Sequence, residues 1–136
     1  MSGYTISTTL TRPYGAALEA VRRALGEQGF GILTEIDLRA TLKAKLDVDV
    51  GPQMILGACR PALAHEALNA EPAIAAVLPC NVVVRAVDDA TTVVEAFDPD
   101  VMAGLAESPA LHTVAADAKQ RLSSALARLD SPEGED

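Results

Sequence analysis

Two cysteines and a histidine hold most of the reactive chemistry of this sequence. Cys59 and Cys80 are its two cysteines, and His65 lies between them in the spacing Cys-x5-His-x14-Cys. Thiolate and imidazole are the usual protein ligands of soft and borderline metal ions. Standard zinc motifs place two ligands within a few residues of each other, and this spacing does not. We therefore expect no metal site, and we keep as the alternative hypothesis a thiol-dependent redox or metal-binding protein that uses Cys59, His65 and Cys80.

A structural role is the commoner one for each of these side chains. Free cysteine is among the residues most often buried, and there it behaves as a small hydrophobe. His65 falls on the polar face of a predicted helix, so contact with water alone accounts for it. The opposite face of that helix is expected to be buried and consists of Leu63, Ala64, Ala67 and Leu68. A working thiolate needs a lowered pKa and an exposed sulfur, so the pKa values of the two thiols separate the redox hypothesis from the structural one.

A ligand site is expected where the strand that ends at Cys59 runs into the helix that begins at Pro61. The first backbone N–H groups of a helix have no partner within the helix, and they favour anions. Gly57 leaves room for a ligand to come close, although tight packing of a neighbouring element explains a glycine there equally well. The predicted ligand-binding residues, for a small molecule or an anion, are Cys59, Arg60, His65, Cys80, Asn81 and Arg85. The sequence identifies no cofactor.

Asn81 and Arg85 share one face of a predicted valine-rich strand, because residues four apart on a strand point the same way. An arginine on such a strand reaches water or pairs with an acid, and Glu95 on the next strand is the expected cross-strand partner. A binding spot for an anion is one interpretation. A surface ion pair of little energetic value is the more frequent one.

No catalytic constellation is visible in the sequence. Gly26, Gly29 and Gly31 have the wrong spacing for a phosphate-binding loop, and they follow a predicted helix instead of opening one. No serine lies in the Gly-x-Ser-x-Gly pattern of a nucleophile turn. Catalytic residues are therefore unknown, and enzymatic activity is left open. The favoured interpretation is a non-enzymatic ligand-binding or interaction protein.

Charge and composition argue against nucleic acid and membranes as partners. The formal net charge is −8 and the 11 Lys and Arg residues are scattered, so a phosphate backbone or an anionic membrane surface is repelled. Aromatic residues make up only 3%, which leaves few platforms for stacking on single-stranded bases. The first ten residues lack the basic and apolar regions of a signal peptide. We expect a cytoplasmic protein with reduced thiols.

Side-chain periodicity predicts strands that alternate with helices. Runs of β-branched and alternating apolar residues predict strands over 4–10, 30–36, 54–59, 80–87 and 91–97. Helical spacing of apolar residues predicts helices over 14–28, 38–46, 61–70, 72–78, 99–105 and 109–129. Gly29 is expected to end the first helix in a left-handed conformation, and Asp37 and Asp98 are expected to cap the helices that follow them.

This order of elements predicts an α+β fold. So few helices do not bury both faces of five strands, and the simplest packing is a mostly antiparallel sheet of about five strands with the helices on one face. At 136 residues the chain has the size of one domain, expected over 1–130 and followed by a disordered acidic tail over 131–136. An open sheet leaves edge strands that a second copy can cover. We expect a homodimer whose contacts involve the first strand or the strand over Met54–Cys59, with the alanine-rich faces of the last two helices as a further candidate surface.

The strongest family signal lies between Gly51 and Arg85, in GPQMILGACRPALAHEALNAEPAIAAVLPCNVVVR. Its matching pieces, with one further step near the end, are Ile55–Cys59, Pro61 with the helix after it, Glu71–Pro72, Leu78–Val84 and Asp98–Pro99. These pieces resemble the domain-of-unknown-function 302 family, over most of residues 4–129. The resemblance implies a compact α+β fold in which a curved antiparallel sheet packs against helices, similar to the TATA-binding-protein-like layout, and it does not imply DNA binding. The family has no established activity, so the resemblance supplies no catalytic residues.

Overall fold

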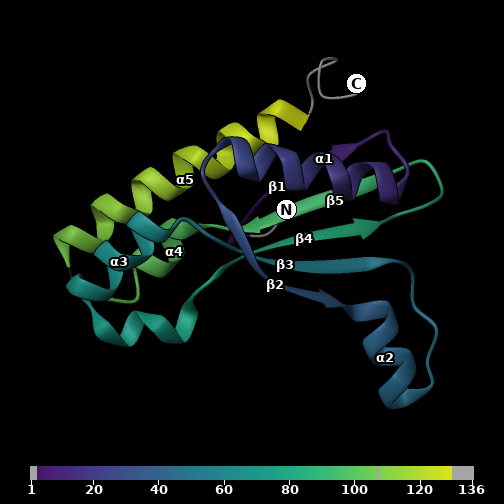
Figure 1. Ribbon diagram of the computed structural model, residues 1–136, viewed down its shortest axis with the longest axis horizontal. Coiled ribbons are helices and arrows are strands. Elements are labelled where there is room, and N and C mark those ends of the chain that lie inside the picture. Colours follow the sequence, from purple (N-terminus) through teal and green to yellow (C-terminus); the bar gives the residue numbers. More distant parts are fainter. Residues whose placement is uncertain (1–2, 107, 130–136) are drawn as a thin grey trace.

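The computed structural model describes residues 3–106 and 108–129, which form the predicted alternation of strands and helices (Figure 1). In chain order the elements are β1 (Thr5–Leu10), α1 (Tyr14–Glu27), β2 (Gly31–Asp37), α2 (Leu38–Leu46), β3 (Gln53–Cys59), α3 (Pro61–Ala70), the 3-10 helix η1 (Pro72–Val77), β4 (Cys80–Ala86), β5 (Thr92–Phe97), α4 (Pro99–Ala103) and α5 (Pro109–Leu129). The predicted tail over 131–136 lies outside the described residues. No helix in the described part of the chain is both long and apolar enough to span a membrane.

The five strands form one open sheet in the order β1-β5-β4-β3-β2, and every pairing is antiparallel. The predicted α+β class with an antiparallel sheet is confirmed. The prediction that the strand over Met54–Cys59 lies at an edge is wrong, because β3 pairs with β2 on one side and with β4 on the other. The edges of the sheet are β1 and β2.

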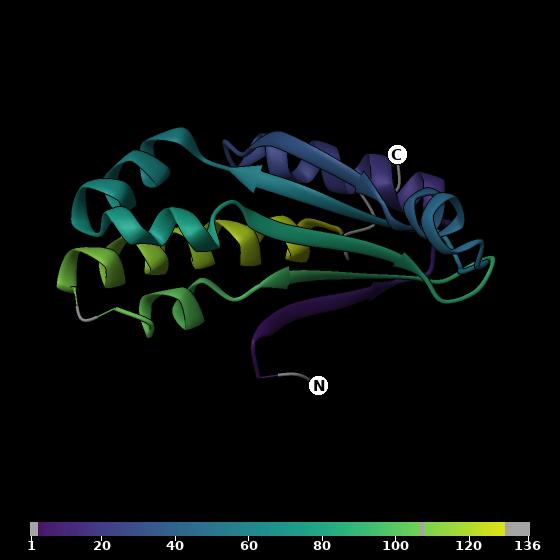
Figure 2. The same cartoon turned by 90° about the horizontal axis from the view of Figure 1, so that it is seen from below.

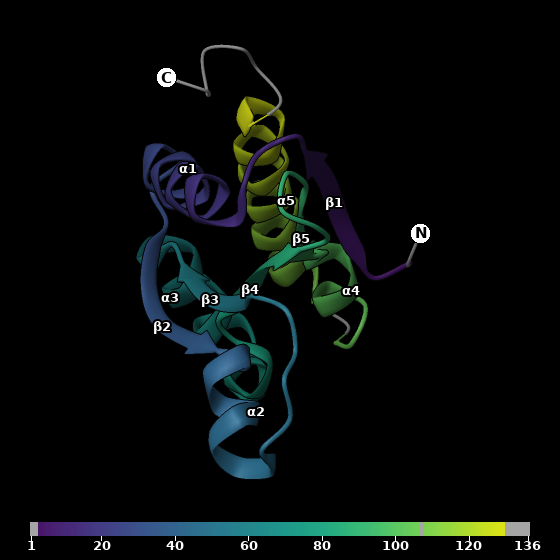
Figure 3. The same ribbon diagram turned by 90° about the vertical axis from the view of Figure 1, so that its right-hand side faces the viewer.

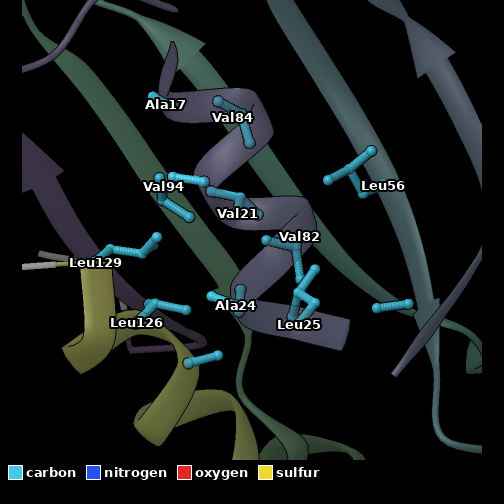
Figure 4. Packing of buried hydrophobic residues seen from close by; sticks show 14 of the residues in the cluster. Ala17, Val21, Ala24, Leu25, Leu56, Val82, Val84, Val94, Leu126 and Leu129 are labelled. Carbon is cyan, nitrogen blue, oxygen red and sulfur yellow. The ribbon is translucent and has the colours of Figure 1, made fainter. Parts of the chain in front are cut away.

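One face of the sheet packs against α1 and the second half of α5 to form the first hydrophobic cluster (Figure 3). Side chains alternate between the two faces of the sheet along each strand, so every second residue of a strand faces this cluster. Val82 and Val84 on β4 and Val94 on β5 are therefore fully buried. Val21 and Leu25 of α1 pack onto these valines (Figure 4). With so few aromatic residues, the core is built almost entirely from aliphatic side chains.

A second hydrophobic cluster lies beyond one end of the sheet. There α3, η1 and α4 pack around the first half of α5, and α2 lies at the opposite end of the sheet (Figures 1 and 2). The apolar stripe predicted along α5 is buried throughout, but it serves two cores. Its first part joins the second cluster through Leu111, Val114, Ala115 and Ala118, and its last part joins the first cluster through Leu122, Ala125, Leu126 and Leu129.

Local chemistry explains where the helices begin and end. Gly29 has φ 86°, the left-handed conformation that favours glycine, and it follows the end of α1. Asp37 accepts a hydrogen bond from the N–H of Ala40, and Asp98 accepts one from the N–H of Asp100, both at 2.9 Å. Asp98 also pairs with Lys119 of α5 at 3.1 Å, which ties α4 to the long helix.

Four expectations need correction. The segment after Glu71 is a 3-10 helix, η1, rather than a continuing α-helix. The helix after Pro99 ends at Ala103, and Leu105 lies beyond it and is exposed, because Gly104 forms the C-cap. Leu68 was expected on the buried face of α3, but only Leu63 and Ala67 are buried there. The apolar stripe of α2 is at most half-buried, since the helix lies beyond the sheet and its main contacts are with the adjoining strands.

Candidate functional site

The two hydrophobic clusters do not close completely against each other, and a narrow apolar pocket lies at their junction. It is bounded by the end of β3, the start of β4, and helices α3, α4 and α5. Its lining consists of Phe30, Ala58, Cys59, Arg60, Leu63, Ala64, Ala67, Leu78, Pro79, Cys80, Met102, Val114 and Ala118. The empty space, counted out to the open mouth, is about 370 Å³. The space that can hold the centre of a water-sized molecule is only about 30 Å³, so a ligand larger than a few atoms must lie partly in the open mouth.

Three of the six predicted ligand-binding residues line this pocket. Cys59 closes β3, Arg60 follows it, and Cys80 opens β4, so the strand pairing of Ala58 with Cys80 brings all three to one place. His65 and Asn81 are exposed and are not part of the lining. Asn81 lies outside because successive residues of a strand point to opposite faces, and Cys80 takes the face toward the core.

Arg85 lies well away from the pocket, further along β4. Its Nη1 donates to Glu95 Oε1 on β5 at 2.7 Å, so the predicted cross-strand partner is confirmed. Thr5 of β1 also donates to Glu95, at 3.3 Å. The hydrogen bond from Arg85 is the main cause that lowers the pKa of Glu95. The pair is partly exposed, which limits its contribution to stability to a fraction of a kcal/mol, roughly 0.2–1.

Arg60 differs from the other pocket residues in carrying a full charge. It precedes Pro61 at the N-terminal cap position of α3 and makes no side-chain capping bond. Its side chain lies against Gly29, so that a Cβ added to that glycine would be 3.0 Å from Nε of Arg60. The Nε atom is buried and has no hydrogen-bond partner among the described residues. The left-handed glycine after α1 therefore leaves the room in which this guanidinium sits.

Both thiols of the pocket are free and are shifted away from the reactive thiolate form. Burial raises the pKa of Cys59 above its usual value. Burial, followed by repulsion from a charged Cys59, raises the pKa of Cys80 to about 11. The two cysteines are thus close enough to influence each other, yet both are protonated at neutral pH. Activated cysteines show the opposite shift, because a nearby cation or helix N-terminus lowers their pKa.

The proposed metal ligands do not form a cluster. Within the described residues, no three His, Cys, Asp or Glu side chains are grouped so that they could hold a metal ion. His65 lies on the exposed side of α3, while both cysteines line the pocket.

Gly57, singled out in the sequence, is small for a packing reason. It pairs with Thr34 of β2 across the sheet and is buried. A Cβ added to Gly57 would collide with Thr34 Oγ1 and would come within 2.8 Å of Pro79 Cγ. Protein side chains, and not a ligand, occupy the space that glycine leaves.

The apolar wall of the pocket was not foreseen from the sequence. Met102 of α4 and Val114 and Ala118 of α5 are distant in the chain from Cys59 and Cys80. The only signal was the stripe along α5, which predicts burial but does not say which of its residues border a cavity.

Comparison with known proteins places this arrangement in a family. The sequence model for "Domain of unknown function DUF302" matches residues 6–129. The chain belongs to the DUF302 family. This DUF302 protein is similar to the crystal structure of an uncharacterized conserved DUF302 protein from Bacillus stearothermophilus, with 28% identity and a TM-score of 0.84 over 93% of this chain and 98% of that one. No curated protein matches the sequence. The resemblance stated from the sequence is confirmed.

Proposed function

We propose that this DUF302 protein is a non-enzymatic binding protein that holds a small, slim, apolar molecule in the pocket between its two hydrophobic clusters. The observation that carries the proposal is the pocket itself. Apart from Arg60, its lining is made of apolar side chains and two protonated thiols. A largely apolar concavity with one or two polar groups is the usual form of a small-molecule site.

The side chains that line the pocket are suited to binding a ligand rather than to catalysing a reaction on it. No carboxylate or imidazole is among them, so the lining holds none of the groups that most often transfer protons. The raised pKa values of Cys59 and Cys80 oppose a thiolate nucleophile or a redox couple. For that reason, and because His65 lies outside the pocket, the thiol-dependent alternative is not carried forward.

Filling the pocket tests the proposal. Ala64 lines it from α3 and is only half-buried, so the ring of Ala64→Phe can turn into the empty space. With 1-octanol as the probe and calorimetry as the measurement, we expect Ala64→Phe to weaken binding by at least about tenfold, the value of roughly two buried methylenes. Ala62→Phe, exposed on the same helix, is the matched control and should bind like the unchanged protein. If Ala64→Phe binds 1-octanol as tightly as the unchanged protein does, this pocket is not the binding site.

We also propose that the protein is cytoplasmic and forms a homodimer through the β2 edge of the sheet. Within the described residues one side of β2 has no strand partner, and although β2 has a bulge at Ile32/Thr34 and two acids, it carries neither proline nor lysine. Leu33 and Ile36 on this strand are 64% and 43% exposed, whereas the β1 edge is rich in Ser and Thr. A second β2 is the natural occupant, since two identical edges satisfy each other around a two-fold axis.

Light scattering tests the dimer. At micromolar concentration the unchanged protein should have twice the 14.1 kDa mass of one chain. Leu33→Lys places a charge on the β2 edge and should return the mass to that of one chain, while Leu105→Lys, equally exposed elsewhere, should leave the dimer intact. A single-chain mass for the unchanged protein would refute the homodimer.

A further inference from the structure

We propose that α2 is a dimerisation arm, whose apolar stripe of Leu38, Leu42 and Leu46 packs against the β2–α2 unit of a second copy of this chain. The β2–α2 unit consists of residues 31–49. The inference rests on the proposed homodimer, and it adds the surface that completes the contact between the two copies. It is carried by the position of the exposed apolar side chains.

Exposed apolar side chains are concentrated in the β2–α2 unit. Eight large hydrophobic residues are exposed in the described part of the chain, and half of them lie within this one unit. They are Leu33, Ile36, Leu46 and Val48. The other four lie in four separate segments of the chain. A contiguous group of exposed apolar side chains on a small protein commonly marks an interface.

Helix α2 has well-satisfied ends but little packing within its own chain. Asp37 caps its start, and Lys43 near its end pairs with Asp47 at 2.9 Å. None of its nine residues is buried. A helix this short is marginally stable in water, and most of the stability of protein helices comes from packing of an apolar stripe. A partner surface supplies the packing that the chain itself lacks.

The size of a stable interface requires more than the β2 edge. Such an interface buries roughly 800 Å² on each partner and includes about 20–30 residues a side. Strand β2 has seven residues, and a bulge between Ile32 and Thr34 makes it irregular. Pairing of two β2 edges therefore falls short, whereas the whole β2–α2 unit comes close. Figure 1 shows α2 beside the end of β2, on the side of the sheet away from β1, so a copy that pairs with β2 also meets α2.

Charge favours a second copy as the partner. The chain has a formal net charge of −8, so two copies repel each other unless the surfaces that meet are locally neutral. Residues 37–49 are neutral because three acids and three bases cancel: Asp37, Asp47 and Asp49 against Arg39, Lys43 and Lys45. Around a two-fold axis this stretch faces itself, and each sign of charge can meet the other.

The test places a charge on the apolar stripe. Leu46 is 66% exposed within one chain, so Leu46→Lys should leave the fold intact. We expect it to raise the dissociation constant of the dimer at least about 100-fold, because two leucine side chains, one from each copy, lose their burial. Ala44→Lys adds the same charge to another face of the last turns of α2 and is the matched control, expected to dimerise like the unchanged protein. Sedimentation equilibrium measures the constants, and circular dichroism checks that both variants are folded.

Hydrogen exchange gives a second readout that needs no substitution. Dilution of the unchanged protein below the dissociation constant of its dimer should speed the exchange of α2 amide hydrogens at least about tenfold, because the partner no longer holds the helix. The central amides of α5, a helix that belongs to both hydrophobic clusters, should exchange at the same rate in both states. Equal exchange of α2 in the dimer and in the single chain would overturn the inference.

The dimer and its arm fail in different ways. If the unchanged protein forms a dimer that Leu33→Lys separates, but Leu46→Lys and Ala44→Lys dimerise alike, the β2 edge carries the contact and the inference about α2 is wrong. If the unchanged protein has the mass of one chain at every concentration, the homodimer fails and this inference fails with it. The occupant of the β2–α2 unit would then be a different protein.

Discussion

Native Cys80 should react with iodoacetamide about 100-fold more slowly at pH 8 than the same thiol in the denatured chain. Burial, followed by repulsion from Cys59, raises the pKa of Cys80 from its usual 9.0 to about 11. Only the thiolate attacks the reagent, so a shift of two pH units lowers the reactive fraction by two powers of ten. The measurement is the labelling rate of Cys80 in the unchanged protein, followed by mass spectrometry of the peptide that carries it, because Cys59 contributes to the shift.

The pH dependence identifies the cause. The labelling rate of Cys80 in the native, unchanged protein should rise about tenfold per pH unit and level off near the raised pKa, whereas slow exposure of the sulfur would give a rate independent of pH. The same shift predicts that the free energy of unfolding falls between pH 9 and about 11, because the unfolded state releases the proton first. Labelling at pH 8 as fast as in urea would contradict the assignment and revive a thiolate function.

Gly57→Ala should lower the free energy of unfolding by about 2 kcal/mol, roughly a 30-fold change in the unfolding equilibrium. The new Cβ meets Thr34 Oγ1 on β2 and Pro79 Cγ at the start of β4. The threonine hydroxyl can rotate away, but the proline ring lies at a fixed distance of 2.8 Å, so the strands must separate slightly. Urea denaturation monitored by circular dichroism measures the difference.

Two variants make this prediction specific. Gly51→Ala adds a methyl group where no atom lies within 4 Å, and it should be neutral or slightly stabilising because alanine restricts the unfolded chain. Combining Gly57→Ala with Thr34→Ala removes one of the two collisions and should restore part of the lost stability. A Gly57→Ala protein as stable as Gly51→Ala would mean that the β2–β3–β4 packing is looser than described.

The fold was predictable from the sequence wherever a structural feature depends on residues that are close together in the chain. Caps such as Asp37 and Asp98 act on N–H groups two or three residues away, so their helix starts could be named without a structure. Alternation along β4 and β5 likewise identified a hairpin that the structure contains. The position of β3 within the sheet was not predictable in this way, because strand order depends on contacts between residues far apart in the chain.

The same distinction between local and distant contacts applies to the candidate site. Cys59, Arg60 and Cys80 could be brought together from the sequence, since a strand–helix junction and one neighbouring strand suffice. The opposite wall depends on how two hydrophobic clusters meet along α5, and a uniform apolar stripe carries no mark of where that happens. The unpaired state of Arg60 was equally invisible, because it depends on which acids fail to reach it.

Helix α2 buries no side chain, although β2 and β3 on either side of it are paired as a hairpin up to Asp37 and Met54. The helix and the loop after it therefore act as an elaborate hairpin connection rather than as a structural support. Opening this connection exposes no core, so its amide hydrogens should exchange through a local fluctuation that is independent of global unfolding. In evolution or in engineering, the chain can therefore lengthen, shorten or accept a foreign peptide within residues 38–51 without disturbing either hydrophobic cluster.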